Sequence, residues 1–337
     1  MSTVDLWLGA LSRLYPVPAG HRVPLLDGNE ALDMLRCGDE VFKELLAAGL
    51  PCDEGPEGPL FDRNDLTNLA LDAGTGGSRP ELAVRYALRW MREDPRGWER
   101  PTSWMFSIEM AAPPDAPVQG VESWSHTRFL PELAGGLIED WESTTAVRFT
   151  PTDFEFDGPG PVTFSGHLRI VGKIQELVSP TLRKITSEFL DRGYRWIRLP
   201  EACQHDFAPI LASGVAPCVA AATYLVNEFR AAGYQAETRG GWILGMLDLA
   251  HSWIEVVDDD GQVKSVDAVL ERLSGLSDNP HPGLAGACLG SRTNRMLPAA
   301  MPAGAPQVLH RSADGTRPAA TRSTSAGTAA LAGSSAA

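Results

Sequence analysis

A cysteine, a histidine and an aspartate follow one another along the chain in an order that could support nucleophilic catalysis: Cys218, His251 and Asp267. Cys218 directly follows Pro217 at the start of an alanine-rich stretch with helical spacing. A thiol at a helix N-terminus lies beside unpaired backbone N–H groups and the positive end of the helix dipole, which favour the nucleophilic thiolate. A histidine with one ring nitrogen bound to a carboxylate can exchange a proton with the thiol through the other. The three residues therefore predict a catalytic triad, with Cys218 as nucleophile, His251 as general base and acid, and Asp267 as orienting carboxylate.

Each of the three also has an ordinary structural interpretation. Free cysteines are commonly inert core residues, His251 could be a hydrogen-bonded core histidine, and Asp267 could cap the end of a strand. If the three residues have only structural roles, the protein would be a binding protein without catalytic activity. Their combined order on a helix and two strands favours the catalytic interpretation.

The residues after Cys218 predict an amphipathic helix that ends near Gly233, where a left-handed residue is expected. Its apolar face carries Ala222, Leu225, Val226 and Phe229. The small residues of its first turns would let it pack closely against a sheet. Cys218 is therefore expected at the floor of a cleft.

His251 and Asp267 are predicted to lie on two antiparallel strands, 250–257 and 262–269. Opposed residues of a hairpin share a face, so the loop length decides whether the two side chains can meet. An odd loop places Asp267 opposite His251 or Trp253, whereas a two-residue loop places it on the other face. We therefore predict an odd loop, with Gly261 in the left-handed conformation of a bulged turn.

Cys203 is a rival nucleophile, with Gln204 and His205 beside it. It has no amphipathic helix after it, and residues two apart in a loop seldom form a stable pair. Cys203 and His205 also come nearest to a metal motif, but the further ligands of a four-coordinate site are missing from the pattern. The sequence predicts neither a metal nor another cofactor.

The composition limits the function classes. The chain has 337 residues, 43% of them apolar, with 29 Lys and Arg against 43 Asp and Glu and a formal net charge of −14. Such a charge does not attract nucleic acids or anionic membranes. No export signal and no long apolar segment are recognisable, and the five cysteines are irregularly spaced, so a cytoplasmic protein with reduced thiols is expected.

Three regions are predicted, within the α+β class. Residues 1–155 are expected to form a helical, Trp-rich domain, a candidate for substrate binding, with one helix over 25–51. A Pro-, Gly- and Asp-rich stretch separates it from a catalytic domain over 156–298, and the small, polar residues 299–337 are expected to be a disordered tail. Trp90, Trp98, Trp104, Trp124 and Trp141 could line a ligand cleft or pack the first two domains together, and packing is favoured because tryptophan is usually largely buried.

Four motifs resemble the bacterial transglutaminase-like cysteine superfamily, whose core is papain-like. They are Cys218 at the head of a helix, the sequence Gly-Tyr-Gln-Ala at 233–236, the sequence His-Ser-Trp-Ile-Glu-Val at 251–256, and Asp267 sixteen positions after His251. The similarity covers about 195–275. It implies a papain-like core with the cysteine helix packed on an antiparallel sheet, and the triad roles given above.

The resemblance also implies acyl transfer through a thioester intermediate. The leading hypothesis is the formation of an amide between a small-molecule or carrier-bound acyl donor and an amine in a biosynthetic pathway; the alternative is a peptidase or amidase with the same triad. The Cys218 N–H is expected to be one oxyanion-hole donor. Gln204 and Trp196 are candidates for the second, since relatives use an amide or an indole there.

Overall fold

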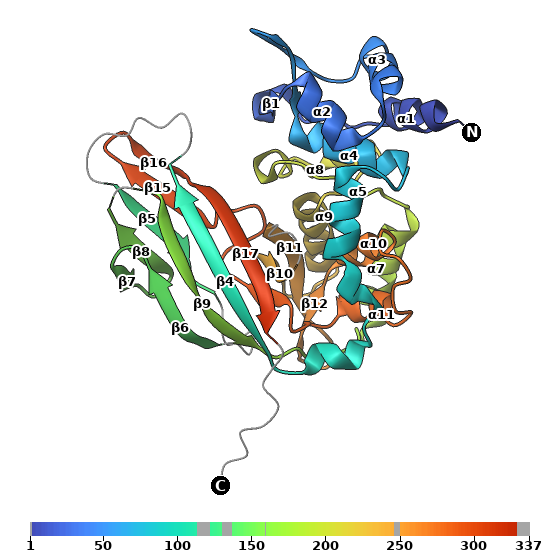
Figure 1. Cartoon of the computed structure of the whole chain (residues 1–337). Helices are drawn as coiled ribbons and strands as arrows, with labels where there is room; N and C mark the ends of the chain where they lie inside the picture. The colour runs from blue at the N-terminus through green and yellow to red at the C-terminus, as the bar shows by residue number, and fades with distance from the viewer. Residues whose placement is uncertain (1, 113–121, 130–136, 159, 246–249, 329–337) are drawn as a thin grey trace.

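Figure 1 shows the computed structural model of the whole chain. The structure describes residues 2–112, 122–129, 137–158, 160–245 and 250–328. Helices gather on one side of the molecule and two large sheets on the other, with a third sheet between them (Figure 1). The mixture of helices and antiparallel sheets agrees with the predicted α+β class.

The first hundred residues form a helical region around a small antiparallel sheet. Its helices are α1 (Thr3–Ser12), α2 (Gly28–Leu35), α3 (Asp39–Ala47), α4 (Arg63–Ala73) and α5 (Arg79–Ala87), and its strands are β1 (Pro24–Leu26), β2 (Asp53–Gly55) and β3 (Gly58–Asp62). The single helix predicted over 25–51 is wrong, because Arg36 and Gly38 adopt left-handed φ angles of 51° and 83° and separate α2 from α3. Short 3-10 helices are η1 (Ala19–His21), η2 (Arg89–Arg92), η3 (Pro95–Glu99) and η4 (Glu201–Cys203).

The region with Cys218 packs helices on a five-stranded antiparallel sheet of order β13-β12-β11-β10-β14. The strands are β10 (Ala236–Ile243), β11 (Ala250–Val257), β12 (Val263–Val266), β13 (Leu289–Gly290) and β14 (Met296–Pro298). The helices are α7 (Pro180–Asp191), α8 (Phe207–Ala212), α9 (Cys218–Ala231), α10 (Ala268–Ser274) and α11 (Leu284–Cys288). Leu225 and Phe229 of α9 share a buried core with Trp253 and Ile254 of β11, so the cysteine helix lies directly on the sheet.

The β11–β12 hairpin has the predicted odd loop. Ile254 pairs with Val266 and Val257 with Val263, which places the next position, Asp267, opposite Trp253. The Gly261 N–H donates to the Asp258 carbonyl at 2.8 Å, and Gly261 has a φ of 73°. This register confirms that Asp267 approaches the face that carries His251.

The two remaining large sheets pack face to face as a β-sandwich. One has the order β16-β15-β5-β8-β7 and the other β17-β4-β9-β6. The strands are β4 (Thr102–Ala111), β5 (Ser123–Thr127), β6 (Leu137–Ser143), β7 (Val147–Phe149), β8 (Asp153–Asp157), β9 (Val162–Ile170), β15 (Val308–Ser312), β16 (Gly315–Pro318) and β17 (Ala320–Thr328). Its core continues to Trp242 and Leu297 of the central sheet, so the sandwich covers the face of that sheet away from α9.

The sandwich corrects the predicted three-region division. The described elements between residues 102 and 157 are the strands β4 to β8 and not helices, and residues 308–328 carry the strands β15 to β17 and not a disordered tail. Residues 329–337 of the predicted tail lie outside the described residues. In β4 alternate residues are buried, the period-two pattern of a half-buried strand. The chain leaves the sandwich after β9, forms the central sheet, and returns to the sandwich at β15, so no domain boundary lies at 155.

The tryptophans of this part of the chain pack within cores. Trp90 and Trp98 lie in the core shared with α9, and Trp104 and Trp124 lie in the sandwich core. Trp141 is 43% exposed. For the four buried rings, the structure agrees with the packing interpretation.

A chain truncated after Gln307 is expected to lose stability, because it lacks β15, β16 and β17. Removing β17 takes away nine residue pairs and leaves β4 paired only with β9, and removing β15 exposes the side chains that pack against the buried Val308. We expect the thermal unfolding midpoint to fall by more than about 5 °C, as measured by circular dichroism. A truncated protein that unfolds at the temperature of the full chain would show that these strands contribute little.

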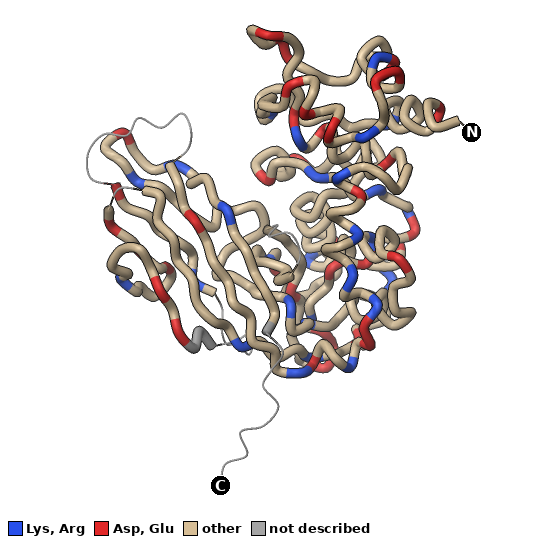
Figure 2. Tube along the Cα trace, viewed as in Figure 1, with Lys and Arg blue, Asp and Glu red and all other residues tan. Residues whose placement is uncertain are grey.

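Lys and Arg are interspersed with Asp and Glu over the helices and over the sandwich in Figure 2. The described residues present no extended basic face in that view, which agrees with the negative net charge of the chain. Among the described residues, none of the helices is both long and apolar enough to traverse a lipid bilayer.

Candidate active site

Cys218 is the first residue of α9, as predicted, with Pro217 at the N-cap in an extended conformation. Pro217 makes no side-chain cap, and the side chain of Gln204 accepts the N–H of Val219 in the first turn of the helix instead. Gly233, with a φ of 92°, follows the end of the helix. The thiol is half-buried and thus reachable from solvent.

His251 and Asp267 form a buried hydrogen-bonded pair. The Nε2 atom of His251 lies 2.6 Å from Oδ2 of Asp267, and the two residues are 8% and 3% exposed. The other carboxylate oxygen, Oδ1, accepts the Leu270 N–H at 2.8 Å and caps α10, while the Asp267 N–H donates to the Cys288 carbonyl. Asp267 is therefore both the helix cap that its simpler interpretation suggests and the partner of His251.

The Cys218 side chain lies close enough to the imidazole of His251 to act on its charge. Because Nε2 faces Asp267, the remaining ring nitrogen Nδ1 is the one available to the sulfur. Behind the ring, Trp253 stacks at 27° with the ring centroids 6.2 Å apart. The structure thus brings the three predicted residues together in the order sulfur, imidazole, carboxylate.

The charge state of His251 reflects two opposing influences. Burial disfavours the imidazolium, but the charge and hydrogen bond of Asp267, with the contact to Cys218, outweigh it and raise the pKa of His251 to about 10. At neutral pH the imidazole is therefore held protonated between a carboxylate and the sulfur. The imidazolium therefore holds a proton that can pass to a leaving group.

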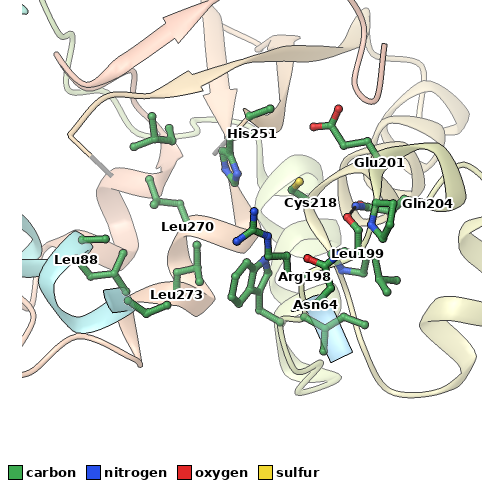
Figure 3. A pocket seen from close by; sticks show the side chains of 18 residues that line it. Asn64, Leu88, Arg198, Leu199, Glu201, Gln204, Cys218, His251, Leu270 and Leu273 are labelled. Carbon is green, nitrogen blue, oxygen red and sulfur yellow. Dashed lines mark hydrogen bonds between the residues drawn. The ribbon is translucent and has the colours of Figure 1, made fainter. Parts of the chain in front are cut away.

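Cys218 and His251 open into a cavity of about 360 Å³ (Figure 3). Its walls are largely apolar and come from both the region with Cys218 and the N-terminal helices. The wall residues of the N-terminal region are Asn64, Val84, Ala87 and Leu88, and those opposite include Ile243, Leu270 and Leu273. The N-terminal helical region therefore contributes directly to the space in front of the sulfur.

Both oxyanion-hole candidates line this cavity. Gln204 is 2% exposed, and its Oε1 accepts the Val219 N–H at 3.0 Å while its Nε2 donates to the Leu199 carbonyl at 2.7 Å. These bonds fix the amide beside the first turn of α9. Trp196 is half-buried and forms part of the wall, so Gln204 is the candidate whose orientation the structure determines.

Cys203, the rival nucleophile, is not among the residues that line the cavity of Cys218. Its Sγ donates to the Pro200 carbonyl at 3.0 Å, and burial raises the pKa of its thiol. His205 is exposed. In the described part of the chain, no cluster of three or more His, Cys, Asp or Glu side chains is placed to hold a metal ion.

Two charged residues of the cavity were missed by the sequence analysis. Arg198 and Glu201 both line it, and Figure 3 shows the Arg198 guanidinium and the Glu201 carboxylate on different sides of the Cys218 sulfur. Arg198 lies in an irregular segment and Glu201 begins the short 3-10 helix η4, so no long periodic element indicates which of their side chains face inward. Sequence spacing offered no signal for either.

No protein-family model and no curated protein matches the sequence. Among solved structures, the crystal structure of a candidate cysteine protease from Cytophaga hutchinsonii is similar to this chain, with 10% sequence identity and a TM-score of 0.46. The similarity covers 68% of this chain and 92% of that one. A likeness of this size assigns no function, and the resemblance to the transglutaminase-like superfamily stays a prediction.

Proposed function

We propose that this protein is a cysteine-dependent acyltransferase with a transglutaminase-like core, which joins an acyl group to an amine through a thioester on Cys218. The observation that carries the proposal is the buried bond between His251 and Asp267, with the sulfur on the other side of the imidazole and open to a cavity. A buried histidine tied to a carboxylate and facing a thiol at a helix N-terminus is the arrangement that acyl transfer through sulfur needs.

The reaction would proceed in two halves. The Cys218 thiolate attacks the acyl carbonyl carbon, and the oxyanion that forms is stabilised by the Cys218 N–H and an N–H of the Gln204 amide. The tetrahedral species collapses, and the leaving group departs with the proton of His251. The amine then attacks the thioester and passes a proton to the now neutral His251, and the Cys218 thiolate leaves.

Incubation with short acyl thioesters tests the first half. We expect intact-protein mass spectrometry to show one acyl group added, and peptide mapping to locate it on Cys218. Addition of an amine should release the group as an amide. The Cys203→Ala variant, whose substitution lies outside the cavity lining, should be acylated as the unmodified chain is.

The alternative, a peptidase or amidase, uses the same site with water as the acceptor. Release of the acyl group as free acid at the same rate with and without amines would favour hydrolysis. Absence of any acyl adduct, with rapid cleavage of peptides, would also favour it. Absence of both activities would leave a binding protein.

A further inference from the structure

The cavity in front of Cys218 contains two opposite charges that do not neutralise each other. Arg198 and Glu201 are both half-buried wall residues. Across the described chain, neither the guanidinium nor the carboxylate has a hydrogen bond to its side chain or an ion pair within 4.0 Å. A charge held in a partly buried, mostly apolar cavity is costly unless a partner compensates it.

The neighbouring side chains that could compensate these charges are already engaged. Asp62 lies close enough to act on Arg198 electrostatically, but its carboxylate accepts the Val23 N–H at 2.7 Å and the Asn64 N–H at 2.6 Å. His251, which acts on Glu201 electrostatically, is bonded to Asp267. The two charges in the cavity are therefore left for a ligand.

Burial shifts the pKa of each group in the direction that disfavours its charged form, and a bound partner of opposite charge would oppose that shift. Burial raises the pKa of the Glu201 carboxyl, which His251 opposes, and burial together with the Arg63 cation lowers the pKa of the Arg198 guanidinium. A bound ammonium would restore the charge of Glu201, and a bound carboxylate would compensate Arg198. A bidentate guanidinium is well suited to a carboxylate.

We propose that the acceptor site takes an amino carboxylate, such as a free amino acid, with its ammonium group at Glu201 and its carboxylate at Arg198. The proposal rests on the proposed acyl transfer, for which it names the acceptor. The apolar wall formed by Leu88, Leu270 and Leu273 would accept an aliphatic or aromatic side chain. Because Arg198, Glu201 and Cys218 line the same cavity, an acceptor held in this way occupies the space in front of the thioester.

Glu201 would then have a chemical task beyond binding. An ammonium cannot attack, so it first gives one proton to the Glu201 carboxylate and becomes a neutral amine. The amine nitrogen forms a bond to the thioester carbon, its second proton moves to neutral His251, and the carbon–sulfur bond breaks to regenerate the Cys218 thiolate. Glu201 finally returns its proton to solvent, so charge and protons balance.

Binding to the full chain with the Cys218→Ser substitution tests the site without requiring turnover. The probes are L-leucine and L-phenylalanine, each with its decarboxylated amine, isoamylamine or phenethylamine, and its deaminated acid, 4-methylpentanoate or 3-phenylpropanoate. We expect calorimetry to show that at least one amino acid binds at least about tenfold more tightly than both of its analogues. Equal affinities within each set, or no binding by any probe, would overturn the proposal.

Substitutions then assign the two charges. Arg198→Gln should remove the preference for the amino acid over the amine, with Arg198→Lys retaining part of it, and Glu201→Gln should remove the preference over the acid. Arg36→Gln is the matched control, because Arg36 is exposed and is not among the residues that line the cavity. Melting curves establish that each variant is folded. If both preferences persist in folded Arg198→Gln and Glu201→Gln proteins, these residues do not form the site.

The result separates this inference from the proposed function. Acylation of Cys218 with no discrimination among the probes would overturn the acceptor assignment and leave acyl transfer standing. Charge-dependent binding of an amino acid without acylation of Cys218 would support the site and contradict the reaction.

Discussion

Cys218→Ala is expected to reduce the turnover of acyl thioesters by at least about 10³-fold. The variant retains the cavity and the His251–Asp267 pair but has no atom that can form the thioester. The measurement is the initial rate of thiol release from an acyl thioester, followed with a chromogenic thiol reagent. The small volume of the change, at a half-buried position, should leave the thermal unfolding midpoint close to that of the unmodified chain.

Cys203→Ala is the matched control for this prediction. Cys203 is also a half-buried thiol, but its Sγ is directed to the Pro200 carbonyl. We expect its turnover to stay within about twofold of the unmodified chain. Loss of turnover in Cys203→Ala together with normal rates in Cys218→Ala would identify Cys203 as the nucleophile and contradict the triad.

The cysteine helix and the hairpin register could be predicted because both depend on local rules. A 3.6-residue period, a proline before Cys218 and Gly233 at the end define α9 without tertiary information. In the hairpin, Asp267 shares a face of the sheet with His251 only if the loop has an odd number of residues. The acidic turn with Gly261 provides such a loop. These two local features were enough to bring sulfur, imidazole and carboxylate together.

The sandwich could not be predicted in the same way because its main stabilisation is long-range. β4 pairs with β17, more than two hundred residues later, and the small polar residues of β17 carry no hydrophobic signal of their own. Backbone hydrogen bonding to β4 orders this segment. The strand alternation of Trp104, Phe106, Ile108 and Met110 was present in the sequence but was obscured by the nearby Pro- and Gly-rich stretches.

The two charged residues of the cavity could not be predicted from the sequence for a related reason. Arg198 and Glu201 become wall residues of a cavity only because α4 and α5 cover the cleft from the N-terminal side. Asn68 of α4 fixes this contact, since it accepts the Arg198 N–H at 2.7 Å and donates to the Arg198 carbonyl at 2.8 Å. Hydrogen bonds between two segments so far apart in sequence do not produce a periodic pattern in either segment, so the sequence does not indicate them.

Asp267→Asn is expected to preserve the fold and to disable His251. The asparagine carbonyl oxygen can still accept the Leu270 N–H and cap α10. Its amide then faces Nε2 of His251 as a donor, which favours the imidazole tautomer with its proton on the nitrogen beside the sulfur. The carboxylate charge that raises the pKa of His251 is lost, so burial dominates and the pKa falls.

Two measurements check this prediction. Turnover of acyl thioesters should fall by about 10²- to 10⁴-fold, and the rate of Cys218 alkylation by iodoacetamide at pH 6 should drop toward that of a simple thiol, because no imidazolium remains to stabilise the thiolate. In the unmodified chain the raised pKa of His251 contributes stability that is fully present below about pH 6.5 and is lost as the pH rises through about 10. The variant should lack this loss between neutral and alkaline pH. Unchanged alkylation at pH 6 in a folded Asp267→Asn protein would show that the carboxylate serves only as the cap of α10.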